Sequence, residues 1–209
     1  MYIETLDEKT NKVFHLLKNT VTVFDFCLAG GTGLSLQLGH RISIDLDFFT
    51  NKEFETERLI QSLKLLGKLE IEETKEDTFN GSLDGVKISF FKTPVNLLFE
   101  KKDFEGLKIA DERDISAMKI LAISNRGSKK DFVDLYFLLK RYSIQDILNF
   151  FKEKYASYGY NLMYILKSLV YFNDAEDDVE PIYIIKTDWK DIKKEIQKIT
   201  DLYIKDNIN

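Results

Sequence analysis

Two aspartates one residue apart, Asp45 and Asp47, are the side chains whose types and spacing most directly indicate chemistry. On a β-strand both carboxylates would point to one face, while Ile44, Leu46 and Phe48 would point to the other face and be buried. Carboxylates roughly 6 Å apart repel by about 3 kcal/mol at an effective dielectric of about 20. We therefore expect Asp45 and Asp47 to bind a metal ion. Hard oxygen ligands without a nearby histidine or thiol suit Mg²⁺, with Mn²⁺ as the alternative.

A glycine-rich segment precedes the aspartates and begins an expected helix that ends at Gly39. Gly30 and Gly31 would let the backbone approach a triphosphate closely, and Thr32 would cap the helix and offer a hydroxyl donor. The segment has no Gly-Lys-Ser/Thr ending, which excludes a P-loop, and it lacks the third glycine of the dinucleotide fingerprint. Together with the aspartates it predicts metal-dependent phosphoryl transfer.

Further charged residues leave two interpretations open. Lys119 interrupts an apolar run, so its ammonium either extends to solvent or faces an anion in a cleft, and Arg126 follows two turns along the same helix face. Asp131 and Asp134 share one face of the next helix, where they serve either as local ion-pair partners or as a functional carboxylate. Arg41, beside His40, would contact phosphate or pair with a nearby acid.

The elements that must position these residues change character near residue 111. The first part predicts a packing helix at 4–19, a helix at 55–66 and a small sheet, with expected strands at 21–28, 42–50, 68–73, 77–80, 85–92 and 107–110. Turns are expected at Asn80-Gly81 and Asp84-Gly85. The second part predicts helices at 114–125, 129–140, 144–156, 161–172 and 189–204, with a solvated acidic connection at 173–181. We therefore expect an α+β chain with a core domain at 1–110 and a helical region at 111–209.

The composition, 209 residues with 44% hydrophobic residues and a net charge of −5, is that of a globular protein. A broad basic face is not expected, so an RNA partner would bind a local patch. The single cysteine, Cys27, excludes an internal disulfide and is expected to be a buried thiol. The polar N-terminus is unlike a signal peptide, and no segment has the apolar length of a membrane helix. These features predict a cytoplasmic protein without a membrane partner.

Two stretches carry a family resemblance: GGTGLSLQLGHRISIDLDFF at 30–49 and DISAMKILAISNRGSKKDFVDLYFLLK at 114–140. Together they resemble the AbiEii/AbiGii toxin family of bacterial nucleotidyltransferases, a branch of the polymerase-β-like superfold. The resemblance covers about 26–49 and 111–140 well, and the C-terminal third hardly at all. It implies a nucleotidyltransferase core with a mixed or antiparallel sheet, followed by a helical half that completes the active-site cleft.

The function implied is Mg²⁺-dependent transfer of a nucleoside monophosphate from an NTP to an acceptor, with release of pyrophosphate. The chain would be the toxin of a toxin–antitoxin, abortive-infection type system, with an antitoxin protein as partner and the 3′ end of tRNA as acceptor. A basic cluster is the candidate tRNA site: Arg126, Lys129, Lys130, Lys140 and Arg141. The alternatives are a nucleotidyltransferase that modifies a small molecule such as an antibiotic, and a catalytically silent binding module.

The resemblance also assigns residue roles. Lys119 matches a position associated with activity, and Asp131, ahead of Asp134, would be a functional carboxylate facing the cleft. Gly30, Gly31, Thr32, Arg41 and Arg126 would bind the nucleotide. The strand at 86–91, VKISFF, lacks the third carboxylate that many polymerase-β-like enzymes carry on a later strand. Either Asp131 or another carboxylate replaces it, or Asp45 and Asp47 hold the metal with water and substrate phosphates.

Overall fold

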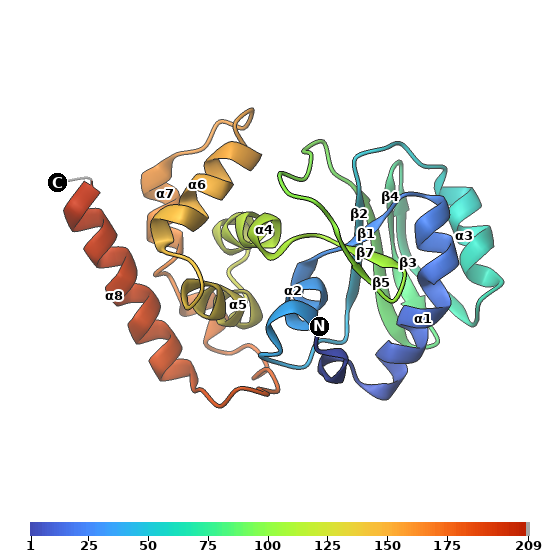
Figure 1. The fold of residues 1–209 in the computed structure, drawn as a ribbon, viewed down its shortest axis with the longest axis horizontal. Coiled ribbons are helices and arrows are strands. Elements are labelled where there is room, and N and C mark those ends of the chain that lie inside the picture. Colours follow the sequence, from blue (N-terminus) through green and yellow to red (C-terminus); the bar gives the residue numbers. More distant parts are fainter. Residues whose placement is uncertain (208–209) are drawn as a thin grey trace. The chain divides into compact units, whose positions relative to one another are not determined.

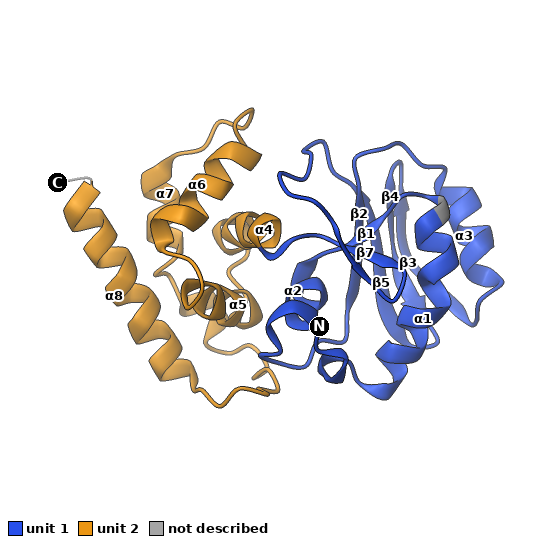
Figure 2. Cartoon of the chain, in the orientation of Figure 1, with its two compact units in different colours: residues 1–112 blue, residues 113–209 orange. Residues whose placement is uncertain are grey.

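The computed structural model describes residues 1–207 as two compact units (Figure 2). The first unit is Met1–Glu112 and holds a seven-stranded mixed sheet with helices, and the second unit begins at Arg113 and is helical. The α+β class expected from the sequence is confirmed. No helix among the described residues is both long and apolar enough to cross a membrane.

The first unit carries all the strands that the structure describes (Figure 1). Its helical elements are η1 (Ile3–Thr5), α1 (Glu8–Val23), α2 (Gly30–Leu38) and α3 (Thr56–Lys64). Its strands are β1 (Cys27–Leu28), β2 (Leu46–Thr50), β3 (Leu69–Lys75), β4 (Thr78–Leu83), β5 (Val86–Lys92), β6 (Lys102–Phe104) and β7 (Leu107–Ile109). They are ordered β3-β4-β5-β2-β1-β7-β6, and β2 pairs parallel with β5 and antiparallel with β1.

One face of this sheet is packed against α1 and α3, which lie together on one side of the strands (Figure 1). Leu46 and Phe48 of β2 join Ile88 and Phe90 of β5 in this core, and the Phe48 and Phe90 rings stack at 5.0 Å. Side chains alternate along a strand, so Asp47 and its cross-strand neighbour Ser89 point to the opposite face. The core thereby fixes the register that exposes Asp47 to the side away from α1 and α3.

Two strand predictions and one turn prediction from the sequence were wrong. The segment 21–28 was expected to be a strand, but α1 continues to Val23 and only Cys27–Leu28 pairs in the sheet. Val21 is buried with the α1 face, and tertiary packing of this kind overrides β-propensity. The strand expected at 42–50 begins only at Leu46. Asn80-Gly81 is not a turn, because both residues lie inside β4.

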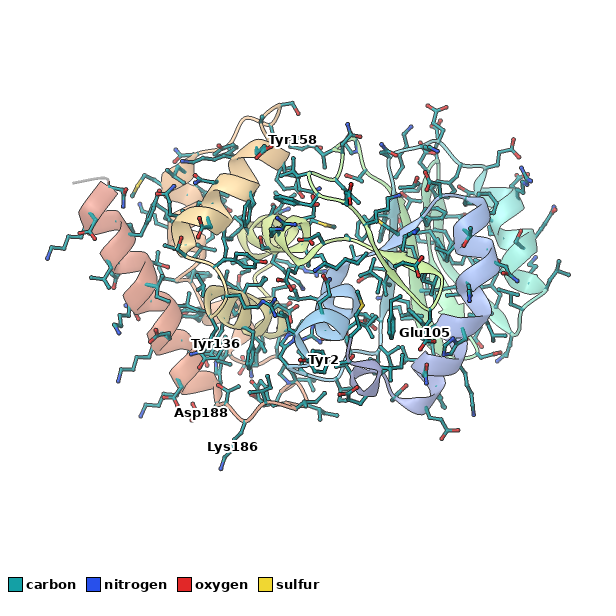
Figure 3. All side chains as sticks on the ribbon, in the orientation of Figure 1. Tyr2, Glu105, Tyr136, Tyr158, Lys186 and Asp188 are labelled. Carbon is teal, nitrogen blue, oxygen red and sulfur yellow. The ribbon has the colours of Figure 1, made fainter. Side chains whose placement is uncertain are left out.

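The predicted helix end at Gly39 was correct. Gly39 has φ +67°, the left-handed conformation that glycine adopts most readily. Tyr2, labelled in Figure 3, covers this turn: its backbone N–H donates to Leu36 O at 2.8 Å, and a Cβ on Gly39 would lie 2.8 Å from its ring. A side chain at position 39 would therefore be both strained and blocked.

The second unit is formed by α4 (Glu112–Asn125, whose first residue belongs to the first unit), α5 (Lys129–Leu139), α6 (Ile144–Lys154), α7 (Leu162–Ser168) and α8 (Trp189–Asn207). These helices agree with the sequence prediction except at their ends. Ser143 and Asp146 form a capping box that starts α6, and Ile192 and Ile196 form the buried stripe of α8. The second unit has its own apolar core around Phe132, Phe151 and Leu166.

The acidic segment before α8 is not a merely solvated connection, as the sequence had suggested. Asp178 Oδ2 accepts the backbone N–H of Lys129 at 2.8 Å and so caps α5. The buried Lys129 ammonium contacts Glu180 and two backbone carbonyls of this segment. Trp189 donates from Nε1 to Glu176 at 3.0 Å, and its ring lies against Phe132 and Phe172 and under Lys129 and Lys193.

Candidate active site

Asp45 and Asp47 lie at the start of β2, with Asp47 in the strand and Asp45 just before it. Both side chains are partly exposed, whereas Leu46 and Phe48 are fully buried, as the alternation predicted. The prediction for Ile44 was wrong: it is 54% exposed because it precedes the paired part of the strand. The two carboxylates therefore lie where β2 begins, not within a long, regular strand.

Gly30 and Gly31 have no side chains, and the space this leaves is occupied by Asp47 and Arg41. A Cβ on Gly30 would lie 2.6 Å from Asp47 Oδ2, and Gly30 has φ +60°. A Cβ on Gly31 would collide with Arg41 Nη2 and lie 3.4 Å from Ser43 Oγ. The Asp47 carboxylate and the Arg41 guanidinium thus lie beside consecutive residues at the N-terminus of α2.

Thr32 has a different position from the one predicted. The N-cap of α2 is Ala29, so Thr32 lies inside the first turn and does not cap the helix. Its Oγ1 lies 2.8 Å from Ser43 Oγ and donates a hydrogen bond to the backbone carbonyl of Asp45. Thr32 therefore ties α2 to the segment that delivers Asp45.

The start of α2 also has the chemistry of an anion site. Ala29 supplies no side-chain acceptor, so the N–H groups of the first turn have no partner within the helix. Arg41 is buried close by, and its Nη1 donates to Ile42 O at 3.0 Å. Backbone N–H groups and a fixed guanidinium are donors suited to phosphate oxygens.

The donor set fits a divalent cation that keeps other ligands. Among residues 1–207 no group of three or more His, Cys, Asp and Glu side chains is placed to hold a metal ion. Asp45 and Asp47 supply hard oxygen donors, and Ser89 places a hydroxyl on the neighbouring strand opposite Asp47. Mg²⁺ commonly binds one or two carboxylates and completes its coordination with water and substrate phosphates. Two carboxylates are therefore sufficient for this type of site.

The second unit brings Lys119, Asp131 and Asp134 together. Lys119 Nζ lies 2.8 Å from Asp131 Oδ1 and 2.5 Å from Asp134 Oδ2, and all three side chains are buried. The sequence left open solvent or a cleft anion as the destination of Lys119, and a local ion pair or a functional carboxylate as the role of Asp131 and Asp134. The structure gives Lys119 two carboxylate partners on α5, which agrees with the ion-pair alternative for Asp131 and Asp134.

Asp131 is held by further donors. Its Oδ2 accepts from Arg126 Nε at 3.2 Å and from Ser128 Oγ at 2.6 Å. Burial raises the pKa of this carboxyl, but the positive charges of Lys119 and Arg126 and the hydrogen bonds outweigh burial and lower the pKa from 3.8 to about 2. Asp131 is therefore an ionised, fixed anchor for the Arg126 side chain, which remains 64% exposed.

Sequence reasoning missed Ser43 and Ser89. Ser43 is a buried partner of Thr32, and Ser89 is buried beside Asp47, at a position where the strand pattern showed only that an acid was absent. The available signal was a serine between the apolar residues Ile88 and Phe90 of β5. The expected basic cluster also loses a member, because Lys129 is buried against the acidic segment.

A mixed sheet, a glycine-started helix and an Asp-x-Asp pair at the entry of the next strand form the arrangement that the nucleotidyltransferase resemblance implied. The sequence profile of the family described as nucleotidyl transferase AbiEii toxin, type IV TA system, matches residues 24–109 and 86–205. The chain belongs to this family of nucleotidyltransferase toxins from toxin–antitoxin systems. The resemblance noted from the two sequence stretches is confirmed.

Relatives and solved structures agree with this assignment. An uncharacterized protein of Aquifex aeolicus (strain VF5) is 40% identical over 169 residues, which are 76% of this chain and 81% of that protein. JHP933 of Helicobacter pylori has a TM-score of 0.58 at 19% identity, covering 96% of this chain and 94% of its own. MenT4, a nucleotidyltransferase toxin of Mycobacterium tuberculosis H37Rv, has a TM-score of 0.54 at 15% identity, covering 84% and 74%. At these identities the two solved structures show a shared fold.

Proposed function

We propose that this nucleotidyltransferase transfers a nucleoside monophosphate from an NTP to an RNA acceptor, with tRNA as the first candidate, and releases pyrophosphate. The observation that carries the proposal is the Asp47 carboxylate held against Gly30 at the N-terminus of α2. Carboxylates and phosphate-binding N–H groups are thereby adjacent, as nucleotidyl transfer requires. The RNA acceptor is supported by the toxin family and by exposed cations of the second unit: Arg126, Lys130, Lys140 and Arg141.

In the proposed reaction an acceptor hydroxyl attacks the α-phosphorus, the bond to the pyrophosphate oxygen breaks, and the hydroxyl proton passes to a carboxylate oxygen of the aspartate pair. The Gly30 and Gly31 backbone and Arg41 would hold the β- and γ-phosphates. Thr32 and Ser43 would keep Asp45 in position through its backbone carbonyl. Positioning and charge neutralisation supply most of the rate enhancement in this class of reaction.

Asp45 and Asp47 would hold the divalent metal, Mg²⁺ or Mn²⁺, which neutralises phosphate charge when bound. The experiment is incubation of the protein with MgCl₂, each α-labelled NTP in turn and total tRNA, with Asp47→Asn as the matched variant. We expect label in RNA for at least one NTP and a loss of at least 100-fold in Asp47→Asn, which keeps the size of the side chain.

Two arms of this assay separate the proposal from its alternatives. Label that enters RNA from a γ-labelled NTP but not from an α-labelled NTP would mean phosphoryl transfer instead. Label that enters a small hydroxyl compound but no RNA would replace the RNA acceptor by the small-molecule alternative. If Asp47→Asn transfers as well as the parent protein, the assigned site is wrong.

Lys119 and Asp131 remain predictions from the family resemblance, and their buried contacts make a simple truncation uninformative. Lys119→Arg keeps the positive charge between Asp131 and Asp134 but moves it. If Lys119 acts in transfer, this variant retains its melting temperature and loses transfer. If Lys119 serves stability, transfer and melting temperature change together.

A further inference from the structure

The second unit has an open pocket of about 380 Å³ at the end of α4, beside α7. It lies outside the aspartate and glycine residues of the candidate active site. Its lining combines aromatic, basic and small residues with one acidic residue: Arg126, Gly127, Tyr164, Lys167, Tyr171 and Asp174. Gly127 has φ +53°, which ends α4 and turns the chain away, so that the last turn of the helix forms one wall.

Two tyrosines give this pocket exposed aromatic surface. Tyr164 is 59% and Tyr171 is 53% exposed, although large aromatic side chains are more often buried. The Tyr164 hydroxyl donates to Ser124 O at 3.0 Å, which fixes its ring relative to α4. A fixed ring with an exposed face loses little conformational entropy when another flat group stacks on it.

Two cations accompany the tyrosines. The Arg126 side chain is oriented by the hydrogen bond from its Nε to the buried Asp131 carboxylate. Lys167 is exposed on α7. Asp174 contributes one opposing charge, so the pocket lining carries two positive charges against one negative charge. In a chain with a net charge of −5, this local excess selects for an anionic ligand.

We propose that this pocket binds an unpaired segment of RNA, with a nucleobase stacked on Tyr171 and a flanking phosphate at Arg126 and Lys167. Aromatic stacking combined with cations along the backbone is the usual way in which proteins hold single-stranded nucleic acid. A base inside a duplex is stacked on both faces by its neighbours and has no face free for a tyrosine. Paired RNA is therefore not expected to bind in this pocket. This inference rests on the proposed RNA acceptor, for which the pocket would be the docking site.

The test measures binding of the full-length protein to a labelled, unstructured 12-nucleotide RNA by fluorescence anisotropy, without NTP. Tyr171→Ala is expected to weaken binding about 5- to 100-fold, since stacking on one base is worth about 1–3 kcal/mol, while Tyr171→Phe keeps the affinity. Lys167→Gln should weaken binding several-fold. The matched controls are Tyr158→Ala, on an exposed tyrosine labelled in Figure 3, and Lys198→Gln, on α8; neither residue lines the pocket.

Three results would overturn the inference. The first is an affinity within twofold of the parent protein in both Tyr171→Ala and Lys167→Gln with unchanged melting temperatures. The second is equal competition by a hairpin duplex of the same length. The third is displacement of the RNA by excess NTP, which would make the pocket a nucleotide site.

The inference and the proposed function can fail separately. Asp47→Asn is expected to bind the RNA as tightly as the parent protein, because Asp47 lies in β2 and not in the pocket lining. RNA binding through Tyr171 without any transfer would support the pocket and contradict the proposed acceptor. Transfer to RNA that is unaffected by Tyr171→Ala would support the function and contradict the pocket.

Discussion

Gly30 and Gly31 are neighbours in sequence, but each makes room for a different charged side chain. Gly30 lies against the Asp47 carboxylate in a left-handed conformation, and Gly31 lies against the guanidinium of Arg41. The glycines were expected to serve a phosphate directly. Their surroundings show that they first allow the carboxylate and the cation to approach the helix start, which is where a phosphate would bind.

This difference predicts unequal effects of alanine at the two positions. Gly30→Ala combines a left-handed backbone with a contact at Asp47 Oδ2, and should cost about 1–2 kcal/mol from the backbone alone and abolish transfer. Gly31→Ala displaces the Arg41 guanidinium but requires no left-handed backbone, so it should cost less stability and weaken NTP binding. Urea unfolding and NTP titration of both variants measure this; equal effects of the two substitutions would contradict the assignment.

The lowered pKa of Asp131 predicts how stability depends on pH. A carboxyl whose pKa falls from 3.8 unfolded to about 2 folded contributes about 2 kcal/mol, present above pH 4 and lost as the pH falls toward 2. The sign follows because the unfolded state takes up the proton first. Unfolding free energies from pH 7 to pH 2 should show this loss in the parent protein and a smaller loss in Asp131→Asn. The exposed Asp201→Asn is the control and should follow the parent curve.

At the scale of elements, buried charge joins the helices of the second unit. Lys154 of α6 lies 2.8 Å from Asp114 of α4, and both side chains are buried. Neither helix pattern predicted this pair, because the spacing of apolar residues tells which residues share a face but not which helix will cover that face.

Lys154→Met should therefore destabilise the protein by about 3–5 kcal/mol, because the Asp114 carboxylate stays buried without this cation. Adding Asp114→Asn to Lys154→Met should recover part of the loss. The exposed pair Lys12 and Glu8 on α1 gives the comparison, where Lys12→Met should cost less than about 0.5 kcal/mol. Chemical denaturation of these variants measures their free energies of unfolding. A double variant no more stable than Lys154→Met would contradict the assigned cause, the buried Asp114 carboxylate without this cation.

The helices were predictable in place because their apolar stripes are regular, as in α3 with Leu59 and Leu63. The strands were less predictable. Asn80-Gly81 has the composition of a hairpin turn, but turns at Asp77 and Asp84 set a register in which Asn80 faces Ser89. Gly81 instead allows close contact with the Glu70 carbonyl and the Phe79 ring. Local turn chemistry could not reveal this packing.

At the scale of the whole molecule, a net charge of −5 limits RNA binding to local contacts. Only part of the candidate site could be predicted from the sequence. The Asp-x-Asp pair and its glycines were recognisable because they are close in the chain. The partners of Lys119 and the burial of Lys129 were not recognisable, because both depend on segments that meet only after folding.

Local contacts predict a shallow salt dependence of RNA binding. If Arg126 and Lys167 each neutralise one phosphate of a single strand, log K should fall against log salt with a slope of about −1.4, and Lys167→Gln should reduce this slope by about 0.7. Anisotropy titrations between about 0.05 and 0.3 M NaCl would measure both slopes. A slope of about −4 or steeper would indicate a broad basic surface instead.

Trp189 is the one tryptophan of the sequence, and it lies at the start of α8 between aromatic rings and lysine side chains. Its intrinsic fluorescence therefore reports on the junction of α5, α8 and the acidic segment. Excitation at the red edge of the absorption band gives this signal without any label or substitution. The unfolding of the helical unit can thus be followed optically while circular dichroism records both units together.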